Sequence, residues 1–140
     1  MLRTRLSPPG RGLQRDRGSA PIQVAIIFPV IILILFGAIQ GFTIAWAHNA
    51  VATAAREGVS AGRMYGAGPG DGASKARKAA ADLGGNLVSG IQVSTAGTSR
   101  TRMSIRVRGQ AVSLVPGLKS ITVSSSASGP IEQWVTQEGN

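Results

Sequence analysis

The chain has no cysteine and, from residue 18 to residue 55, no Lys, Arg, Asp or Glu. The lack of cysteine excludes disulfides, thiolate metal sites and cysteine nucleophiles. The lack of charge extends over 38 consecutive positions, and residues 22–46 among them are almost wholly apolar. An α-helix rises about 1.5 Å per residue, so about 20 apolar residues cross the hydrocarbon layer of roughly 30 Å. The sequence therefore predicts one membrane-spanning helix, which we place at residues 18–47.

Aromatic residues are scarce as well, at 4% of the 140 positions. Beyond Gly62 only Tyr65 and Trp134 are aromatic, and the region is rich in Ala, Gly and Ser. Such a region buries little apolar surface by itself, and its length suffices for one small domain rather than a multidomain enzyme. We expect its stability to depend on packing against the helix or against a partner.

Basic residues exceed acidic ones, which gives a formal net charge of +9. Residues 1–17 hold five arginines and one aspartate among prolines and glycines, a composition that predicts a disordered basic leader. Basic flanks of this kind stay on the cytoplasmic side of a membrane helix, so the following domain lies outside the cytoplasm. The other ten Lys and Arg are spread over the rest of the chain with five acidic residues. We therefore predict a plasma (inner) membrane protein in contact with lipid, and not a nucleic-acid-binding protein.

Several residues of the apolar run favour helix packing. Pro29 frees a backbone carbonyl and predicts a kink of the kind that membrane helices tolerate. Gly37 and Gly41 are four residues apart, the spacing that lets two membrane helices approach closely. The amides of Gln23 and Gln40 need hydrogen-bond partners, which either another subunit or interfacial water would supply. We predict that Pro29, Gly37 and Gly41 form a helix-packing surface.

Residues 48–65 are predicted to continue the helix as an amphipathic stem. Alanine and valine side chains recur at helical spacing on one broad face, and polar residues occupy the remainder. The face comprises Ala50, Val51, Ala54, Ala55, Val59 and Ala61. A glycine-rich loop at residues 66–72 then ends the helix.

Residues 66–140 are predicted to form a small extracytoplasmic α+β domain. Asp71 or Ser74 caps a second, short helix that extends through Leu83, where two glycines close it. Beyond residue 87 the apolar period changes to two, which predicts three strands in an antiparallel meander. The inward residues are Ile91, Val93, Thr95, Met103, Ile105, Val107, Ile121 and Val123.

Turns are expected between these strands, at residues 96–100 and at residues 116–119. One face of the sheet should pack on a helix. The arginines of the second strand then face water, where basic side chains also discourage association between sheet edges.

No group of residues predicts catalysis. His48 is the sole histidine, and the nearest carboxylate in sequence, Glu57, is too far along a helix to meet it. The six carboxylates are scattered without the paired spacing of acid and base roles. The glycine-rich loop lacks the preceding strand and the Gly-Lys-Ser/Thr ending of a phosphate loop. We predict no catalytic residue, no metal site and no cofactor.

A short signature lies at a fixed distance beyond the apolar run. An Arg-Gly pair precedes the run, a proline and a Phe-Gly pair lie within it, and an Asn-Ala-x-x-x-Ala-Ala-Arg-Glu-Gly block follows. The residues concerned are Arg17, Gly18, Pro29, Phe36, Gly37, Asn49, Ala50, Ala54, Ala55, Arg56, Glu57 and Gly58. This pattern resembles that of the TadE-like family of tight-adherence (Tad) pilus assembly proteins.

The resemblance implies a pilin-like fold and a pseudopilin-like component of a Tad or Flp-type pilus assembly or secretion system. Its partners would be other components of that system and other pseudopilin subunits. In pilins and their relatives a prepilin peptidase cuts after a glycine, and a glutamate five residues later aligns subunits. By that analogy the cut follows Gly18, so that Ser19 becomes the new terminus and Gln23 the fifth residue. Gln23 departs from the expected carboxylate, as does Gln40 at a position where many relatives carry a glutamate.

Two other functions stay open. Ala45, Trp46 and Ala47 fit the small-x-small cleavage rule of an exported protein with a signal peptide, although the apolar run of 24 residues from Ile22 to Ala45 exceeds the usual h-region of about 7–15 residues. The other is a generic single-pass anchor that presents an extracytoplasmic binding domain.

Overall fold

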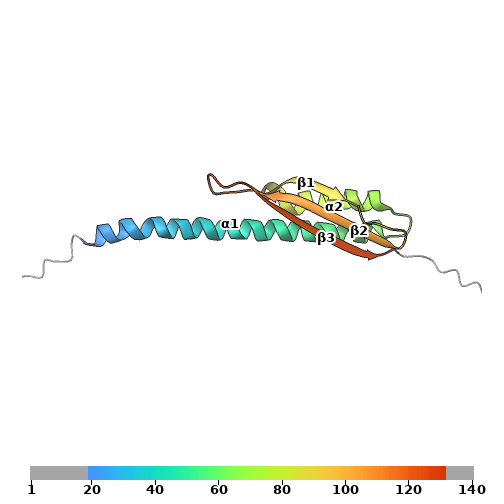
Figure 1. Ribbon diagram of the computed structural model, residues 1–140, viewed down its shortest axis with the longest axis horizontal. Coiled ribbons are helices and arrows are strands. Elements are labelled where there is room, and N and C mark those ends of the chain that lie inside the picture. Colours follow the sequence, from blue (N-terminus) through green and yellow to red (C-terminus); the bar gives the residue numbers. More distant parts are fainter. Residues whose placement is uncertain (1–18, 132–140) are drawn as a thin grey trace, which may run out of the picture. The chain divides into compact units, whose positions relative to one another are not determined.

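The computed structural model describes residues 19–131, with side chains from Pro21 onward. Contacts divide the chain into two units, the first ending at Leu35 and the second beginning at Phe36. The predicted α+β class, with a long helix, a short helix and a three-stranded antiparallel sheet, is confirmed (Figure 1). The elements of the described residues are α1 (Ser19–Gly62), α2 (Pro69–Gly84), the 3-10 helix η1 (Gly85–Leu87), β1 (Val88–Ser94), β2 (Arg102–Ala111) and β3 (Ile121–Pro130).

α1 is one helix of 44 residues that continues through Pro29. It ends at Gly62, three residues before the stem boundary that the sequence predicts at residue 65. The chain turns away soon afterwards at Gly66, whose φ of +77° is a conformation that glycine adopts at little cost. The predicted membrane-spanning part of the helix ends at residue 47, where the helix would leave the lipid. That boundary stays a prediction.

α2 begins earlier than the sequence predicts. The prediction of Asp71 or Ser74 as its cap is wrong, because the N-cap is Gly68 and Pro69 lies in the first turn. Asp71 is the third helical residue, and its Oδ2 accepts a hydrogen bond from the backbone N–H of Gly68 at 2.9 Å. Proline is preorganised for a first turn and a carboxylate there interacts favourably with the helix dipole, so the helix extends back to Pro69.

The sheet has the strand order β1-β2-β3, and both pairs of strands are antiparallel. The predicted inward residues Met103, Ile105 and Val107 are fully buried. Ile121 differs from the prediction and is 43% exposed, because it is the first residue of β3 and lies at the end of the sheet, outside the buried core. β1 contains a bulge at Gly90, whose φ of +61° lies in the left-handed region.

The core lies between one face of the sheet and the two helices. Its members are Ala47, Ala50, Val51, Ala54, Ala55, Val59, Ala76, Ala79, Ala80, Val88, Met103, Ile105, Val107, Ala111 and Val123. Six of these 15 residues belong to α1. In agreement with the expectation from composition, the small domain therefore packs on the stem part of the long helix rather than on itself alone. The arginines of β2 lie on the opposite face of the sheet and are exposed.

Candidate functional site

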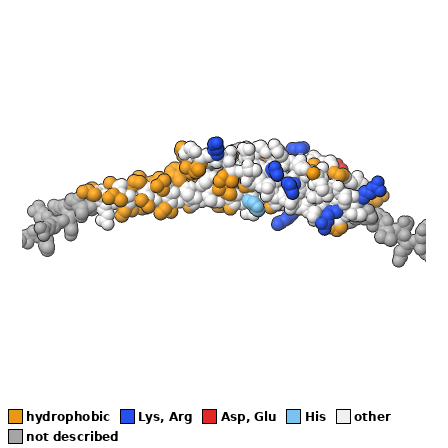
Figure 2. All heavy atoms as spheres, viewed as in Figure 1, with side chains coloured by type: hydrophobic (Ala, Val, Ile, Leu, Met, Phe, Trp, Pro, Cys, Tyr) orange, Lys and Arg blue, Asp and Glu red, His pale blue; other side chains and the backbone are white. Residues whose placement is uncertain are grey.

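The N-terminal part of α1 presents apolar side chains to its surroundings. Large apolar residues from Ile22 to Phe42 are exposed apart from the half-buried Ile32, and among the exposed ones Phe36 at 41% and Leu33 at 71% are the extremes. Figure 2 shows hydrophobic side chains gathered over this part of the helix, whereas Lys and Arg lie over the part that carries the sheet. Among the described residues one helix, Pro21–Gly62, is long and apolar enough to cross a membrane, and its most apolar window is not buried. A core helix of a soluble domain would be buried, so this helix needs lipid or another protein around it.

The residues predicted for helix packing are all accessible. Pro29, Gly37 and Gly41 are exposed on α1. A Cβ placed on either glycine would meet no atom within 4 Å. The positions are thus open to a neighbouring helix, and their role in packing stays a prediction.

The two glutamines of the apolar run lie in different environments. Gln23 is exposed among the side chains of Val24, Ile27 and Phe28. Gln40 is only 8% exposed, and its Oε1 accepts a hydrogen bond from the backbone N–H of Leu114 at 3.0 Å. The expectation that another subunit or water satisfies Gln40 is therefore corrected, because the partner belongs to the loop between β2 and β3 of the same chain.

The signature block divides between two faces of α1. Ala50, Ala54, Ala55 and Gly58 are buried against α2 and the sheet. The other signature residues are Asn49 and Arg56, which are exposed, and Glu57, which is half-buried. Glu57 forms an ion pair with Lys75 of α2, with Oε2 and Nζ 3.6 Å apart. The apolar half of the signature therefore builds the domain, and the polar half lies at its surface.

Small residues set the distance between α1 and α2. A Cβ on Gly58 would lie 2.7 Å from the Cβ of Ala76 and 2.8 Å from the backbone oxygen of Gly72. A Cβ on Gly72 would lie 2.7 Å from the backbone oxygen of Gly58 and 3.2 Å from the Cα of Gly62. Since backbone atoms cannot give way cheaply, the two helices cross at a separation that only these glycines permit. Gly62 and Gly72 are not part of the signature. The glycines and alanines that recur at helical spacing in the sequences of α1 and α2 could have predicted this close crossing.

Residues just before the stem also belong to the packed domain. Ala47 is fully buried, and the indole Nε1 of Trp46 donates a hydrogen bond to the backbone oxygen of Leu83 at 3.0 Å. The hydroxyl of Thr43, buried as well, donates to the backbone oxygen of Ile39 at 3.0 Å, which satisfies it within the helix. The sequence did not predict these contacts. Leu83 is 37 residues from Trp46, and both hydroxyl and indole bond to backbone oxygens, which leave no trace in the residue types.

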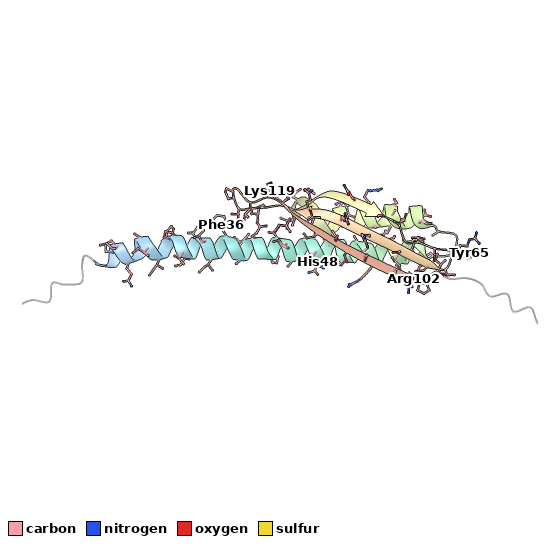
Figure 3. All side chains as sticks on the ribbon, viewed as in Figure 1. Phe36, His48, Tyr65, Arg102 and Lys119 are labelled. Atoms are coloured by element: carbon pink, nitrogen blue, oxygen red, sulfur yellow. The ribbon has the colours of Figure 1, made fainter. Side chains whose placement is uncertain are left out.

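The remaining predicted positions bear on processing and on chemistry. Gly18 and the leader at residues 1–17 lie outside the described residues, and Ser19 is the first residue of α1. His48 is exposed on α1 (Figure 3). Between Pro21 and Ile131 no three His, Cys, Asp or Glu side chains gather in a way that could hold a metal ion.

Comparison with known proteins finds a match over the long helix α1. A family model described as TadE-like protein matches residues 18–60. No curated protein matches the chain, and no solved structure does. The matched residues coincide with nearly all of α1, including both its exposed apolar part and its buried small-residue part. The resemblance inferred from the signature is confirmed, and the chain carries a TadE-like segment at residues 18–60.

Proposed function

We propose that this protein is a single-pass, pseudopilin-like membrane component of a Tad or Flp-type pilus assembly or secretion system. The observation that carries the proposal is the coincidence of the TadE-like segment, residues 18–60, with α1. The leader stays in the cytoplasm by its positive charge, and residues 48–131 lie outside the plasma membrane. The protein acts through contacts with other proteins and uses no catalytic group.

The two parts of α1 suit assembly in different ways. Its exposed apolar part can exchange lipid for the helices of other subunits at little cost, because either environment is equally apolar. Gly37 and Gly41 then allow a neighbouring helix to approach closely. The stem and the sheet supply the polar and charged contacts that distinguish one partner from another.

Processing by a prepilin-type peptidase is part of the proposal. The cut after Gly18 removes the five arginines of the leader and leaves Ser19 as the terminus of α1. Gln23 is then the fifth residue, and its exposed amide can donate and accept hydrogen bonds but cannot neutralise the terminal amine of a neighbour. We therefore expect subunit alignment through hydrogen bonds rather than through a charge pair.

The packing of α1 supports an anchored protein over a secreted one. Cleavage after Ala47 would remove the Trp46 indole from its acceptor at Leu83 and the Gln40 amide from the loop at Leu114. It would also take the buried Ala47 out of the core and place a new charged terminus at His48, close to the buried Ala50. A signal peptide has no reason to make such contacts with the domain that it exports.

The N-terminal sequence and intact mass of the protein from the membrane fraction test the proposal. A start at Ser19 supports a processed pseudopilin, and Gly18→Leu should then accumulate as the full-length form. A start at Met1 with the protein still in the membrane would contradict processing and leave an anchor. A start at His48 with the protein in the soluble fraction would contradict the proposal as a whole.

A further inference from the structure

The β2–β3 loop, residues 112–120, is held in one conformation by backbone hydrogen bonds. The backbone N–H of Val112 donates to the oxygen of Leu87 at 3.0 Å, and that of Leu118 donates to the oxygen of Val115 at 3.2 Å. Pro116 and Gly117, the latter with φ +86°, occupy the central positions of this turn, as a type II turn requires. The turn predicted at residues 116–119 is present one residue earlier, at residues 115–118, and the loop is held at several points.

This loop holds large apolar side chains out of the core. Leu114 is 45% exposed and Leu118 is 57% exposed. A flexible loop could fold such side chains inward, but the hydrogen bonds of the turn fix them at the surface. Single exposed leucines are common. Two exposed leucines on a short ordered loop, near further exposed apolar residues, indicate a surface that lipid or another protein covers.

The hydrogen bond from Leu114 to Gln40 fixes the place of the loop along α1. Counting about 20 helical residues for the hydrocarbon layer from Ile22 brings its outer edge to about residue 41, next to Gln40. Figure 3 shows the loop with Lys119 beside the part of α1 that carries Phe36. The loop therefore lies on the face of α1 that carries Gln40 and, one turn earlier, the exposed Phe36, which is itself assigned to the bilayer.

We propose that the β2–β3 loop inserts Leu114 and Leu118 into the outer leaflet of the membrane, as a second attachment of the domain beside α1. This inference rests on the proposed membrane anchoring of α1. The occupant is lipid because the leucines continue the lipid-facing surface of the helix at the depth where that surface ends. Lys119, the one charged residue between Arg108 and Glu132, suits a phosphate headgroup, toward which a lysine extends while its stem stays apolar.

The attachment also explains the unusual partner of Gln40. An amide near the hydrocarbon layer needs a hydrogen bond, and so does the backbone N–H of a loop that enters it. The bond at 3.0 Å satisfies the amide oxygen of Gln40 and the backbone N–H of Leu114 without water. Two contacts with the membrane instead of one would restrict the rotation of the domain about α1 and hold one orientation toward neighbouring subunits.

The absence of native cysteine permits a direct test with the full-length chain. Leu118→Cys is labelled with an environment-sensitive fluorophore and reconstituted in vesicles of phosphatidylcholine and phosphatidylglycerol, with and without a lipid-borne quencher. Ala96→Cys, in the loop at the other end of β2, is the matched control, since the ten residues of β2 separate the two loops by about 30 Å. Leu33→Cys reports on the apolar part of α1.

The proposal predicts a blue-shifted spectrum and quenching for the Leu118 probe, as for the Leu33 probe, and an aqueous spectrum for the Ala96 probe. If the Leu33 probe is quenched while the Leu118 probe emits as in water, the loop does not enter lipid although the anchor holds. If the Leu118 probe is blue-shifted but not quenched, protein rather than lipid covers the loop and the proposal is overturned. If the Leu33 probe also escapes quenching, the membrane anchoring itself fails.

Discussion

Gly58 of α1 and Ala76 of α2 are so close that a Cβ on Gly58 would lie 2.7 Å from the Cβ of Ala76. The backbone oxygen of Gly72 lies 2.8 Å from the same position, so the clash has no flexible atom to relieve it. Gly58 is the last residue of the TadE-like signature, and its lack of a side chain lets the second helix lie on the first. The close crossing connects the matched helix with the domain that follows it.

Gly58→Ala should therefore destabilise the domain by about 1–3 kcal/mol, because overpacking costs more than the gain in helix propensity. Pulse proteolysis across a urea series in mild detergent measures the free energy of unfolding. Gly70→Ala is the matched control, since a Cβ there meets no atom within 4 Å, and it should stabilise by up to about 1 kcal/mol. Equal stability of Gly58→Ala and the natural chain would refute the tight crossing.

Gln40→Leu should loosen the β2–β3 loop. The backbone N–H of Leu114 loses its acceptor, which costs about 1–3 kcal/mol when the group stays away from water. Hydrogen exchange of a peptide that covers residues 112–118 should become faster, whereas Gln40→Glu keeps an acceptor oxygen and should retain most of the protection. Unchanged exchange in Gln40→Leu would mean that the loop is held by its own turn alone.

Gly37→Leu or Gly41→Leu should weaken subunit association in the membrane. A larger side chain on this exposed face keeps a neighbouring helix at a distance. Oxidative crosslinking through Ala45→Cys, one helical turn beyond Gly41, measures the association. Ile39→Phe enlarges a side chain on the opposite side of the helix, two residues from each glycine, and should leave crosslinking intact. If both glycine variants crosslink like the natural sequence, these glycines do not form the packing surface.

Trp46→Phe should selectively loosen the C-terminal end of α2. The substitution removes the donor to the Leu83 oxygen, a loss of about 0.5–1.5 kcal/mol, while an aromatic ring stays next to Phe42, whose ring centroid lies 6.1 Å away. Amide exchange at residues 81–85 should rise. Phe42→Leu removes the ring pair but keeps the donor, so it should not have this effect. A rise in both variants would assign the stabilisation to ring packing.

Much of the fold could be predicted because its signals are local. The alternation of Met103, Ile105 and Val107 defines a half-buried strand, and the spacing of Ala50, Ala54 and Ala55 defines a helix face. The structure buries both sets. The length of the uncharged run identified α1 for the same reason, since helix rise and charge are properties of consecutive residues.

The contacts that position the site could not be predicted, because they join distant parts of the chain. Gln40 and Leu114 are 74 residues apart, and Trp46 and Leu83 are 37 apart. Nothing in the local sequence indicates that a loop after β2 returns to the apolar helix. The cap of α2 was missed for a different reason: Asp71 bonds back to Gly68 from inside the helix, so a favoured capping residue lay within the first turn.

The central claim is that lipid surrounds the apolar part of α1 and that the sheet lies outside the cytoplasm. Labelling of intact spheroplasts with a membrane-impermeant maleimide tests it most directly, with Ser126→Cys on the exposed face of β3 and Leu33→Cys on α1. The account predicts that Ser126→Cys reacts without lysis, and that Leu33→Cys reacts only after solubilisation in detergent. Labelling of Ser126→Cys only after lysis, or of Leu33→Cys in intact spheroplasts, would contradict it.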